Sequence, residues 1–441
     1  MKIKLPEDVR KIISDIEAAG FEAYAVGGCI RDSILGREPD DWDITTSARP
    51  EDIKKIFRRT VDTGIQHGTV TVLLHGEGYE VTTYRIDGIY EDARHPKDVS
   101  YTGDLTEDLK RRDFTINALA YNDKSGLVDI YDGLGDLERK VIRCVGDPKE
   151  RFSEDALRMM RAVRFAAQLG FEIAPDTRAA AEALAPNLSR VSVERILTEL
   201  TKLICSDHPG MLKDCYEMGL TAVFIPEFDR CMTSPQNIRH HCYNVGEHIL
   251  HTMEAVRADR VLRFTMLMHD IAKPDVMTVD EEGIIHNKGH AALGEEVSAK
   301  ILRRLHADNA LIDSVRVLVR YHDWRFEADK SSVRRAMNRI GYDLFPLMLE
   351  VQRADIFGQS DYKREEKIAR IDAVHQLYKE IVEDRDAITI KDLDVSGRDL
   401  IEAGIKPGPE IHDILNEMLD YVLGEPGDNK KEILMNKFVL K

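Results

Sequence analysis

The stretch AVGGCIRDSILGREPDDWDITTSA (residues 25–48) decides how the N-terminal part of the chain is interpreted. Gly27 and Gly28 follow a short apolar run that predicts a strand, and they precede a short predicted helix that carries Arg31. Two glycines let the backbone approach a ligand closely, and the N–H groups at a helix start attract anions. Arg31 lies one turn further on and can donate to phosphate oxygens. The turn therefore predicts a phosphate-binding site.

Paired aspartates follow this turn on the next predicted strand, residues 42–45. Asp41 and Asp43 have a spacing of two, so both carboxylates project from one face of an extended chain. Two same-side carboxylates repel each other unless a cation lies between them, and Mg²⁺ prefers carboxylates together with substrate phosphates. Glu80, on the run YEVTTYR, is the candidate third carboxylate. The pattern favours metal-dependent nucleotidyl transfer over the alternative of a solvated acidic turn.

A second charged motif, LKRRDFTINALAY, spans residues 109–121. Arg112 is a candidate for holding a triphosphate, while Asp113 and Asn117 are candidates for hydrogen bonds to a ribose hydroxyl. The alternative is a structural ion pair.

The stretch RFSEDALRMMRAVRFAAQLGF (151–171) predicts one amphipathic helix. Asp155 and Arg158 are i, i+3 neighbours on it, and the arginines at 161 and 164 continue the row. A carboxylate accepts from an exocyclic amine and a guanidinium donates to a ring nitrogen, which is the arrangement that cytosine and adenine share. Asp155, Arg158, Arg161 and Arg164 are thus candidates for reading the base. The alternative is an ordinary surface ion pair.

The whole chain has 441 residues and a formal net charge of −17. Its length predicts several domains, and 43% hydrophobic residues suffice for packed cores. No apolar run is long enough to span a membrane and no signal peptide is evident, so we expect a cytoplasmic protein without membrane contact. The net charge argues against a protein that coats nucleic acid. However, residues 140–225 hold 12 acidic and 12 basic side chains, which leaves room for a local basic groove.

The pattern along the chain predicts an α+β protein. Short alternating runs predict a β-rich head over residues 1–143, and helical patterns follow. We expect a helical neck (144–230), a helical middle domain (231–375) and a helical tail (376–441).

The middle domain contains an adjacent pair, His269 and Asp270, and further histidines and aspartates at intervals of 20 to 33 residues. The candidates are His248, His269, Asp270, His290, His322 and Asp355. Such intervals are typical of ligands supplied by successive helices to the centre of a bundle. Imidazole and carboxylate together suit Mn²⁺, Fe²⁺, Ni²⁺ or Zn²⁺.

The successive motifs of residues 20–230 resemble those of the class II tRNA nucleotidyltransferase and poly(A) polymerase family. The motifs are GGCIRD, DDWD, YEVTTYR, YEDARHP, RRDFTINALAY, YDGLGDLERKVIRCVGDP, the neck stretch quoted above and RVSVERI. The resemblance implies a polymerase-β-like head with a mixed sheet. It implies that Asp41 and Asp43 bind Mg²⁺, that Gly28, Arg31 and Arg112 hold the triphosphate, and that the neck residues recognise the base.

The middle domain resembles the HD superfamily of metal-dependent phosphohydrolases. That resemblance implies a first metal held by His248, His269, Asp270 and Asp355, with His290 and His322 available for a second. Cyclic phosphate ends and 2′-phosphates are the substrates it suggests.

Together these features predict an enzyme that adds C, C and A to the 3′ end of tRNA from CTP and ATP and releases pyrophosphate. Residues 90–99 match the family loop associated with the final A, which favours the full reaction. The alternatives are a poly(A) polymerase, a CC-adding or A-adding enzyme, and an HD phosphohydrolase whose head only binds RNA. A catalytically silent RNA-binding protein is disfavoured by the intact aspartates.

Overall fold

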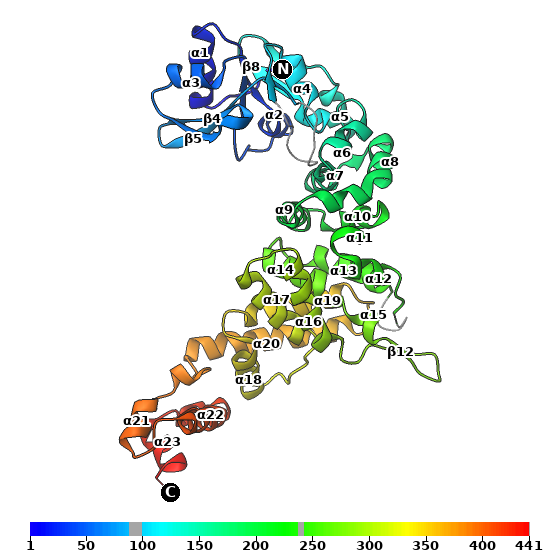
Figure 1. Ribbon diagram of the computed structural model, residues 1–441. Coiled ribbons are helices and arrows are strands. Elements are labelled where there is room, and N and C mark those ends of the chain that lie inside the picture. Colours follow the sequence, from blue (N-terminus) through cyan, green and yellow to red (C-terminus); the bar gives the residue numbers. More distant parts are fainter. Residues whose placement is uncertain (88–98, 237–241, 441) are drawn as a thin grey trace. The chain divides into compact units, whose positions relative to one another are not determined.

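The computed structural model describes residues 1–87, 99–236 and 242–440 (Figure 1). It divides the chain into two compact units, Met1–Pro226 and Glu227–Lys441. Strands are concentrated in the first unit and helices dominate the second, which confirms the predicted α+β class. Of the family loop predicted at residues 90–99, residues 90–98 lie outside the described residues. The division into four domains stays a prediction.

The first unit is built on a seven-stranded mixed sheet. Its spatial order is β3 (Thr60–Gly64), β4 (Thr69–Leu74), β5 (Glu77–Thr83), β2 (Ile44–Thr46), β1 (Ala23–Val26), β8 (Leu119–Asn122) and β9 (Gly126–Asp129). Only β2 and β5 pair in parallel; the other neighbours are antiparallel. Helix α1 (Glu7–Ala18) contacts β1 and buries its apolar face, including Ile12 and Ile16. The sheet therefore supplies the rigid base of the head.

The other head elements are short. They are α2 (Gly28–Ile34), α3 (Pro50–Ile56), α4 (Leu105–Lys110), α5 (Gly133–Arg139), the antiparallel pair β6 (Arg85–Asp87) and β7 (Val99–Tyr101), and the parallel pair β10 (Val141–Ile142) and β11 (Glu172–Ile173).

The strand predicted at 42–45 begins later than expected. Asp41 and Asp43 precede β2, which starts at Ile44. Aspartate is a poor strand former, so the pairing of β2 with β1 and with β5 begins only at the β-branched residue Ile44. The carbonyl of Asp43 nevertheless accepts a hydrogen bond from the Val26 N–H at 3.0 Å, which fixes the backbone beside β1.

Helices complete the first unit. They are α6 (Pro148–Glu154), α7 (Leu157–Leu169), α8 (Pro175–Leu184), α9 (Val193–Ile204), α10 (Leu212–Glu217) and α11 (Thr221–Phe224). The single helix predicted over 151–171 is wrong, because α6 and α7 are separate. Asp155 is extended (φ −139°), and its carboxylate accepts from the Leu157 N–H at 3.0 Å. A short acceptor side chain at this position competes with the helical backbone and starts a new helix.

The second unit is helical. Its elements are α12 (Pro226–Met232), α13 (Val245–Ala255), α14 (Arg260–Met268), α15 (Lys273–Val276), the hairpin β12 (Thr278–Val279) and β13 (Ile285–His286), α16 (His290–Arg304), α17 (Asn309–Tyr321), α18 (Lys330–Ile340), α19 (Phe345–Phe357), α20 (Arg364–Asp384), α21 (Gly397–Glu402), α22 (Pro409–Gly424) and α23 (Lys431–Phe438). Helix α14 packs against α13, α17 and α19, and α16 packs against α17. Among the described residues, no helix has both the length and the apolar character needed to cross a membrane.

Candidate functional site

Three predicted carboxylates come together in the head, where β2 begins beside the middle of β5. Ile44 pairs with Val81 in the parallel β2–β5 ladder, so Asp43 comes next to Glu80 one position earlier in the register. Partial removal from water and then the charge of Asp41 raise the pKa of Asp43 to about 6, with Glu80 adding to the effect and Arg112 opposing it. The site thus gathers more negative charge than the protein neutralises. A divalent cation fits this deficit, because it removes the repulsion between the carboxylates.

The glycine turn holds the guanidinium of Arg112 against the backbone. Gly27 has φ +85°, and a Cβ atom there would lie 2.9 Å from Nη1 of Arg112. Arg112 is 3.6 Å from Asp108, yet its buried Nε has no hydrogen-bond partner among the described residues. Glycine is therefore needed at 27 both for its conformation and for this close approach. Arg112 retains the capacity to donate to an anionic ligand.

Arg31 belongs to a chain of buried polar contacts that runs from the head to α7. Its Nη1 donates to Asn117 Oδ1 at 2.7 Å, while Nε and Nη2 donate to Asp32 at 2.9 and 2.7 Å. Asn117 Nδ2 donates to Asp113 Oδ1 at 3.1 Å, and Arg161 donates twice to Asp113 Oδ2 at 2.8 and 2.6 Å. Burial opposes the charge of Asp113, but Arg161 and Asn117 hold its pKa well below its usual range. The predicted triphosphate, ribose and base residues are thus physically connected.

The predicted pair of Asp155 and Arg158 is split between other partners. Asp155 Oδ2 accepts from Arg195 at 2.7 Å. Arg158 donates to Glu154 at 2.6 Å and to the carbonyls of Arg151 and Arg111 at 3.1 and 3.0 Å. The break between α6 and α7 therefore places the two side chains in separate networks.

Arg164 is the arginine of α7 that lies deepest. Its Nε donates to Glu199 Oε2 at 2.7 Å, and its guanidinium lies 3.6 Å from the ring centroid of Phe165. Arg161 is 3.8 Å from the same carboxylate. Burial lowers the pKa of Arg164, and the charge of Glu199 opposes the shift. Glu199 on α9 thus orients two arginines that face the head.

A cleft of about 500 Å³ brings the head and the α7–α9 region together. Of the predicted residues, Gly28, Arg31, Asp41 and Arg164 line it. The other predicted residues of the head and neck do not: Gly27, Asp43, Glu80, Arg112, Asp113, Asn117, Asp155, Arg158 and Arg161. The cleft is also lined by residues that the sequence did not predict, among them Asp32, Arg37, Asp40, Lys202, Ser206 and Asp207. Asp32 was within the motif GGCIRD. Lys202, Ser206 and Asp207 are distant in sequence, and no spacing pattern connects them to the glycine turn.

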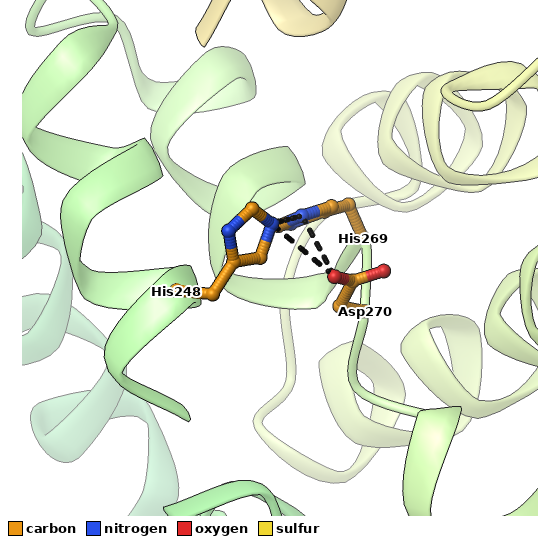
Figure 2. A group of neighbouring side chains, drawn as sticks. All are labelled: His248, His269 and Asp270. Atoms are coloured by element: carbon orange, nitrogen blue, oxygen red, sulfur yellow. Dashed lines mark hydrogen bonds and ion pairs between the residues drawn. The ribbon is translucent and has the colours of Figure 1, made fainter. Parts of the chain in front are cut away.

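The second unit contains the most compact group of ligand-type side chains. Figure 2 shows the imidazoles of His248, on α13, and His269, after α14, pointing toward the carboxylate of Asp270. The two Nε2 atoms are 3.1 Å apart, and each is 3.3 Å from Asp270 Oδ2. Asp355, on α19, places Oδ1 3.0 Å from His248 Nε2 and 3.7 Å from His269 Nε2. These are the four residues predicted for a first metal.

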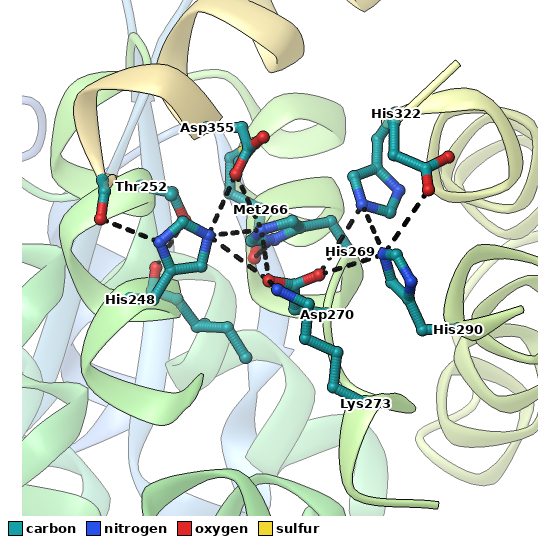
Figure 3. Close-up of polar contacts among 12 residues, drawn as sticks. His248, Thr252, Met266, His269, Asp270, Lys273, His290, His322 and Asp355 are labelled. Carbon is teal, nitrogen blue, oxygen red and sulfur yellow. Dashed lines mark hydrogen bonds and ion pairs between the residues drawn. The ribbon is translucent and has the colours of Figure 1, made fainter. Parts of the chain in front are cut away.

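The two remaining predicted residues form a second group on the other side of Asp270 (Figure 3). The Nε2 atoms of His290 and His322 are 3.2 Å apart, and they lie 3.4 and 3.6 Å from Asp270 Oδ1. Asp270 thus offers one oxygen to each group. The ligand atoms of His248, His269 and Asp270 all lie within 4.8 Å of one another, and so do those of Asp270, His290 and His322.

Main-chain contacts fix the ring orientation of all four histidines. Each Nδ1 lies within 2.9 Å of a main-chain carbonyl oxygen. The carbonyls belong to Gly358, Met266, Asn287 and Val319 for His248, His269, His290 and His322 respectively. A carbonyl only accepts, so Nδ1 carries a proton, and in the neutral ring Nε2 presents a lone pair to the cluster. Two lone pairs about 3 Å apart repel each other, and a metal ion between them is the arrangement that fits.

Two neighbours of this cluster were not predicted from the sequence. Lys273 places Nζ 2.6 Å from Asp270 Oδ2 and donates to Gln236 at 2.8 Å. Asp323 lies 3.8 Å from His290 Nε2. Lys273 lies three residues after Asp270, and Asp323 directly follows His322, so adjacency to the candidate ligands was an available signal. Burial opposes the charge of Asp270, but the histidine contacts and Lys273 hold its pKa far below its usual range.

Comparisons with known proteins place this geometry in a family. Residues 23–143 match the Poly A polymerase head domain, residues 170–232 match the RNA and SrmB-binding site of polymerase A, and residues 290–438 match tRNA nucleotidyltransferase domain 2. The fold and the carboxylate site therefore define a nucleotidyltransferase with a poly(A) polymerase type of head.

Similar proteins and a solved structure identify the family within this class of nucleotidyltransferases. The chain is 38% identical over 436 residues to a CCA-adding enzyme of Levilactobacillus brevis, covering 98% of each chain. It is 59% identical over 198 residues to a CCA-adding enzyme of Limosilactobacillus fermentum, covering 45% of this chain and 50% of the relative. The solved CCA-adding enzyme of Bacillus stearothermophilus in complex with CTP superimposes with a TM-score of 0.71 at 29% identity, covering 99% and 98% of the two chains. The chain belongs to the CCA-adding enzyme family.

Proposed function

We propose that the head cleft is the site at which this chain adds C, C and A to the 3′ end of tRNA from CTP and ATP. The observation that carries the assignment is the excess of carboxylate charge at Asp41 and Asp43, next to the partly unsatisfied Arg112. The solved relative in complex with CTP supports the nucleotide.

The reaction is a nucleotidyl transfer. The 3′ hydroxyl oxygen of tRNA forms a bond to the α-phosphorus, the bond from that phosphorus to the bridging oxygen breaks, and pyrophosphate leaves with the electron pair. The hydroxyl proton passes to solvent. When bound, Mg²⁺ polarises phosphate oxygens and neutralises charge that develops on them.

Different side chains bind the cation, the triphosphate and the ribose. Asp41 and Asp43, with Glu80 beside them, hold the divalent cation. Gly27, Gly28, Arg31 and Arg112 hold the triphosphate through backbone N–H groups and guanidinium donors. Asp113 and Asn117 are assigned to the ribose, and their mutual hydrogen bond positions them.

Base recognition is assigned to the neck. Arg161 and Arg164 are oriented by Asp113 and Glu199, so their donors are held in place. Asp155 and Arg158 serve this role only if they exchange their present partners Arg195 and Glu154.

The test is incubation with tRNA that ends at the discriminator base and with each labelled nucleotide. We expect C, C and A to be added and extension then to stop. Long A tails would show a poly(A) polymerase, and C-only or A-only extension would show a partial enzyme. Asp41→Ala should abolish addition. Asp62→Ala, which removes an exposed aspartate of β3 that does not line the cleft, is the matched control and should retain it.

We further propose that the cluster around Asp270 is a two-metal centre of the HD type that hydrolyses phosphoesters. The specific observation is the inward lone pairs of four histidines around one shared carboxylate. Mn²⁺, Fe²⁺, Ni²⁺ and Zn²⁺ are the candidate metals. A bound metal of this kind supplies a Lewis acid and an activated water. In the reaction the water oxygen bonds to phosphorus, the ester P–O bond breaks, and the departing oxygen gains a proton.

This second assignment has its own test. The purified full chain, expressed in medium with each metal, should retain about two transition-metal ions per chain by elemental analysis and should hydrolyse a phosphoester such as bis(p-nitrophenyl) phosphate. His269→Ala should lose metal and hydrolysis while keeping CCA addition. His286→Ala, which removes an exposed histidine of the hairpin, is the control. A chain that retains no metal would contradict the assignment.

We place both activities in the cytoplasm, as the sequence predicts. tRNA, CTP and ATP are the partners of the first activity.

A further inference from the structure

A cavity of about 400 Å³ adjoins the histidine and aspartate cluster of the second unit. His322 and Asp355 line both the cavity and the cluster, so the cavity ends at the candidate metal centre. Its other walls come from the loop after α17, from α19 and from α20. Neither proposed reaction assigns a role to these walls. A volume of this size is in the range of small-molecule sites.

Four cationic side chains and three carboxylates, Asp323, Asp355 and Glu366, line the cavity, which gives it a small excess of positive charge in a chain whose net charge is −17. The cationic lining residues are Arg325, Lys363, Lys367 and Arg370. Arg325 has no ion pair within the part of the chain that the structure describes, and Lys363 is paired to Glu366 at 3.2 Å. These charges are the ones expected around an anionic ligand.

Lys367 is connected to the metal centre through one side chain. Its Nζ donates to Gln359 Oε1 at 2.7 Å, and Gln359 Nε2 donates to Asp355 Oδ2 at 2.8 Å. Burial and the nearby Arg325 lower the pKa of Lys367. An ammonium held in this way, without a full ion pair, is placed to bind a phosphate whose phosphorus faces the cluster.

An aromatic wall stands beside these charges. The rings of Trp324 and Phe326 both line the cavity, with centroids 5.4 Å apart. Hydrogen bonds fix this wall: Gln352 donates to the Trp324 carbonyl at 3.0 Å, and Arg370 donates to the Phe326 carbonyl. A rigid, partly exposed indole next to cations is a stacking surface for a base.

We propose that this cavity binds one nucleoside phosphoester, with the phosphate at Lys367 and Arg325 and the base against Trp324. The ligand is either a free mononucleotide or the terminal nucleotide of an RNA, because one cavity of this size holds a single nucleoside. The proposal rests on the hydrolytic centre proposed above for its catalytic consequence, but nucleotide binding stands apart from it.

Binding is tested by the fluorescence of Trp324. The chain has two tryptophans, so Trp42→Phe leaves Trp324 as the single reporter. We expect AMP to quench it saturably and ribose 5-phosphate to bind at least about tenfold more weakly. In the same background, Lys367→Ala should weaken AMP binding about tenfold or more, whereas Lys300→Ala, an exposed lysine of α16, should not. Equal binding of AMP and ribose 5-phosphate, or no effect of Lys367→Ala, would overturn the proposal.

Hydrolysis assays distinguish nucleotide binding in the cavity from the hydrolytic centre proposed above. Trp324→Leu should lower kcat/KM for a nucleoside monophosphate by about 5- to 100-fold and leave ribose 5-phosphate hydrolysis unchanged. Tyr342→Leu, which removes an exposed aromatic ring outside the cavity, is the control. If the wild-type chain hydrolyses neither compound, the hydrolytic centre fails while the fluorescence result stands. A short RNA with a 3′-phosphate identifies the source: tighter binding than AMP supports an RNA end, and no binding supports a free nucleotide.

Discussion

The head cleft and the Asp270 cluster handle buried polar groups in opposite ways. In the head, Arg31, Asp113 and Arg161 each meet a complementary partner at hydrogen-bond distance. In the cluster, the Nε2 atoms of four histidines converge on Asp270, whose Oδ2 also lies 2.6 Å from Lys273 Nζ. The head is therefore a preorganised protein network that needs a cation only at its carboxylates. The cluster is complete only with metal.

Of the substitutions that test this difference between the two sites, Asp270→Asn should have the largest effect. The substitution removes the carboxylate that both histidine groups share, so both metals and at least about 10³-fold of the hydrolysis should be lost. CCA addition should be unchanged, because the head has its own carboxylates. Elemental analysis and the two activity assays measure the result, with Asp280→Asn in the exposed hairpin as the control. Retention of both metals by Asp270→Asn would remove the distinction between the sites.

Glu199→Gln tests whether the head network positions base-reading arginines. Glu199 and Arg164 are both buried, so neutralising the carboxylate leaves the guanidinium charge uncompensated. We expect a loss of about 1–3 kcal/mol in the free energy of unfolding by urea. The kcat/KM for CTP should fall by about 10- to 100-fold.

Glu182→Gln is the matched control for this prediction. Glu182 is exposed and pairs with Arg178 at 3.4 Å, so its loss should cost little in stability or activity. A purely structural role of Glu199 would lower stability but leave the discrimination between CTP and UTP intact. A positioning role should reduce that discrimination as well.

Much of the fold and of the site chemistry follows from the sequence, for identifiable reasons. The glycine turn and the paired aspartates are local, and local spacing determined their placement. The six candidate ligands of the cluster were also brought together, and the sequence identified them by an order along the chain that resembles the HD superfamily. The family motifs added the order of the elements.

The features that the sequence did not predict have two causes. Some depend on a side chain that competes for backbone hydrogen bonds, and others depend on contacts between residues far apart in the chain. The helix break at Asp155 arose because its carboxylate accepts from the Leu157 N–H, and helical periodicity is unaffected by such a bond. The pairing of Arg164 with Glu199 joins residues 35 positions apart on two helices. The cavity at Trp324 requires α19 and α20 to be placed, which no motif specified.

Gly27→Ala tests whether the close approach of Arg112 to the glycine turn matters for nucleotide binding in the head. The positive φ of Gly27 costs about 1–3 kcal/mol for alanine, and the new Cβ would press on Arg112. Gly36→Ala is the control, since it also has a positive φ but open space around it. Both variants should lose stability in urea unfolding. Only Gly27→Ala should raise the KM for CTP, and equal KM values would show that the contact with Arg112 is unimportant.

The smallest expected effect is the pH dependence of Mg²⁺ binding at the head. The pKa of Asp43 in the folded chain is about 6, above its ordinary value of 3.8. The folded state therefore binds this proton more tightly than the unfolded state, and without metal this group's contribution to stability falls as pH rises from about 4 to about 6. Mg²⁺ competes with the same proton. Its apparent affinity should fall by up to about tenfold per pH unit below pH 6 and level off above it.

Thermal unfolding with and without Mg²⁺ measures this competition. Stabilisation by Mg²⁺ should be greater at about pH 7.5 than at about pH 5 in the wild-type chain. Asp43→Asn removes the titrating group, so most of the Mg²⁺ effect and its pH dependence should disappear together. The transition metals of the Asp270 cluster do not respond to added Mg²⁺ in this range, because imidazole ligands disfavour it. A pH dependence that persists in Asp43→Asn but vanishes in Asp270→Asn would place the titrating site in the second unit instead.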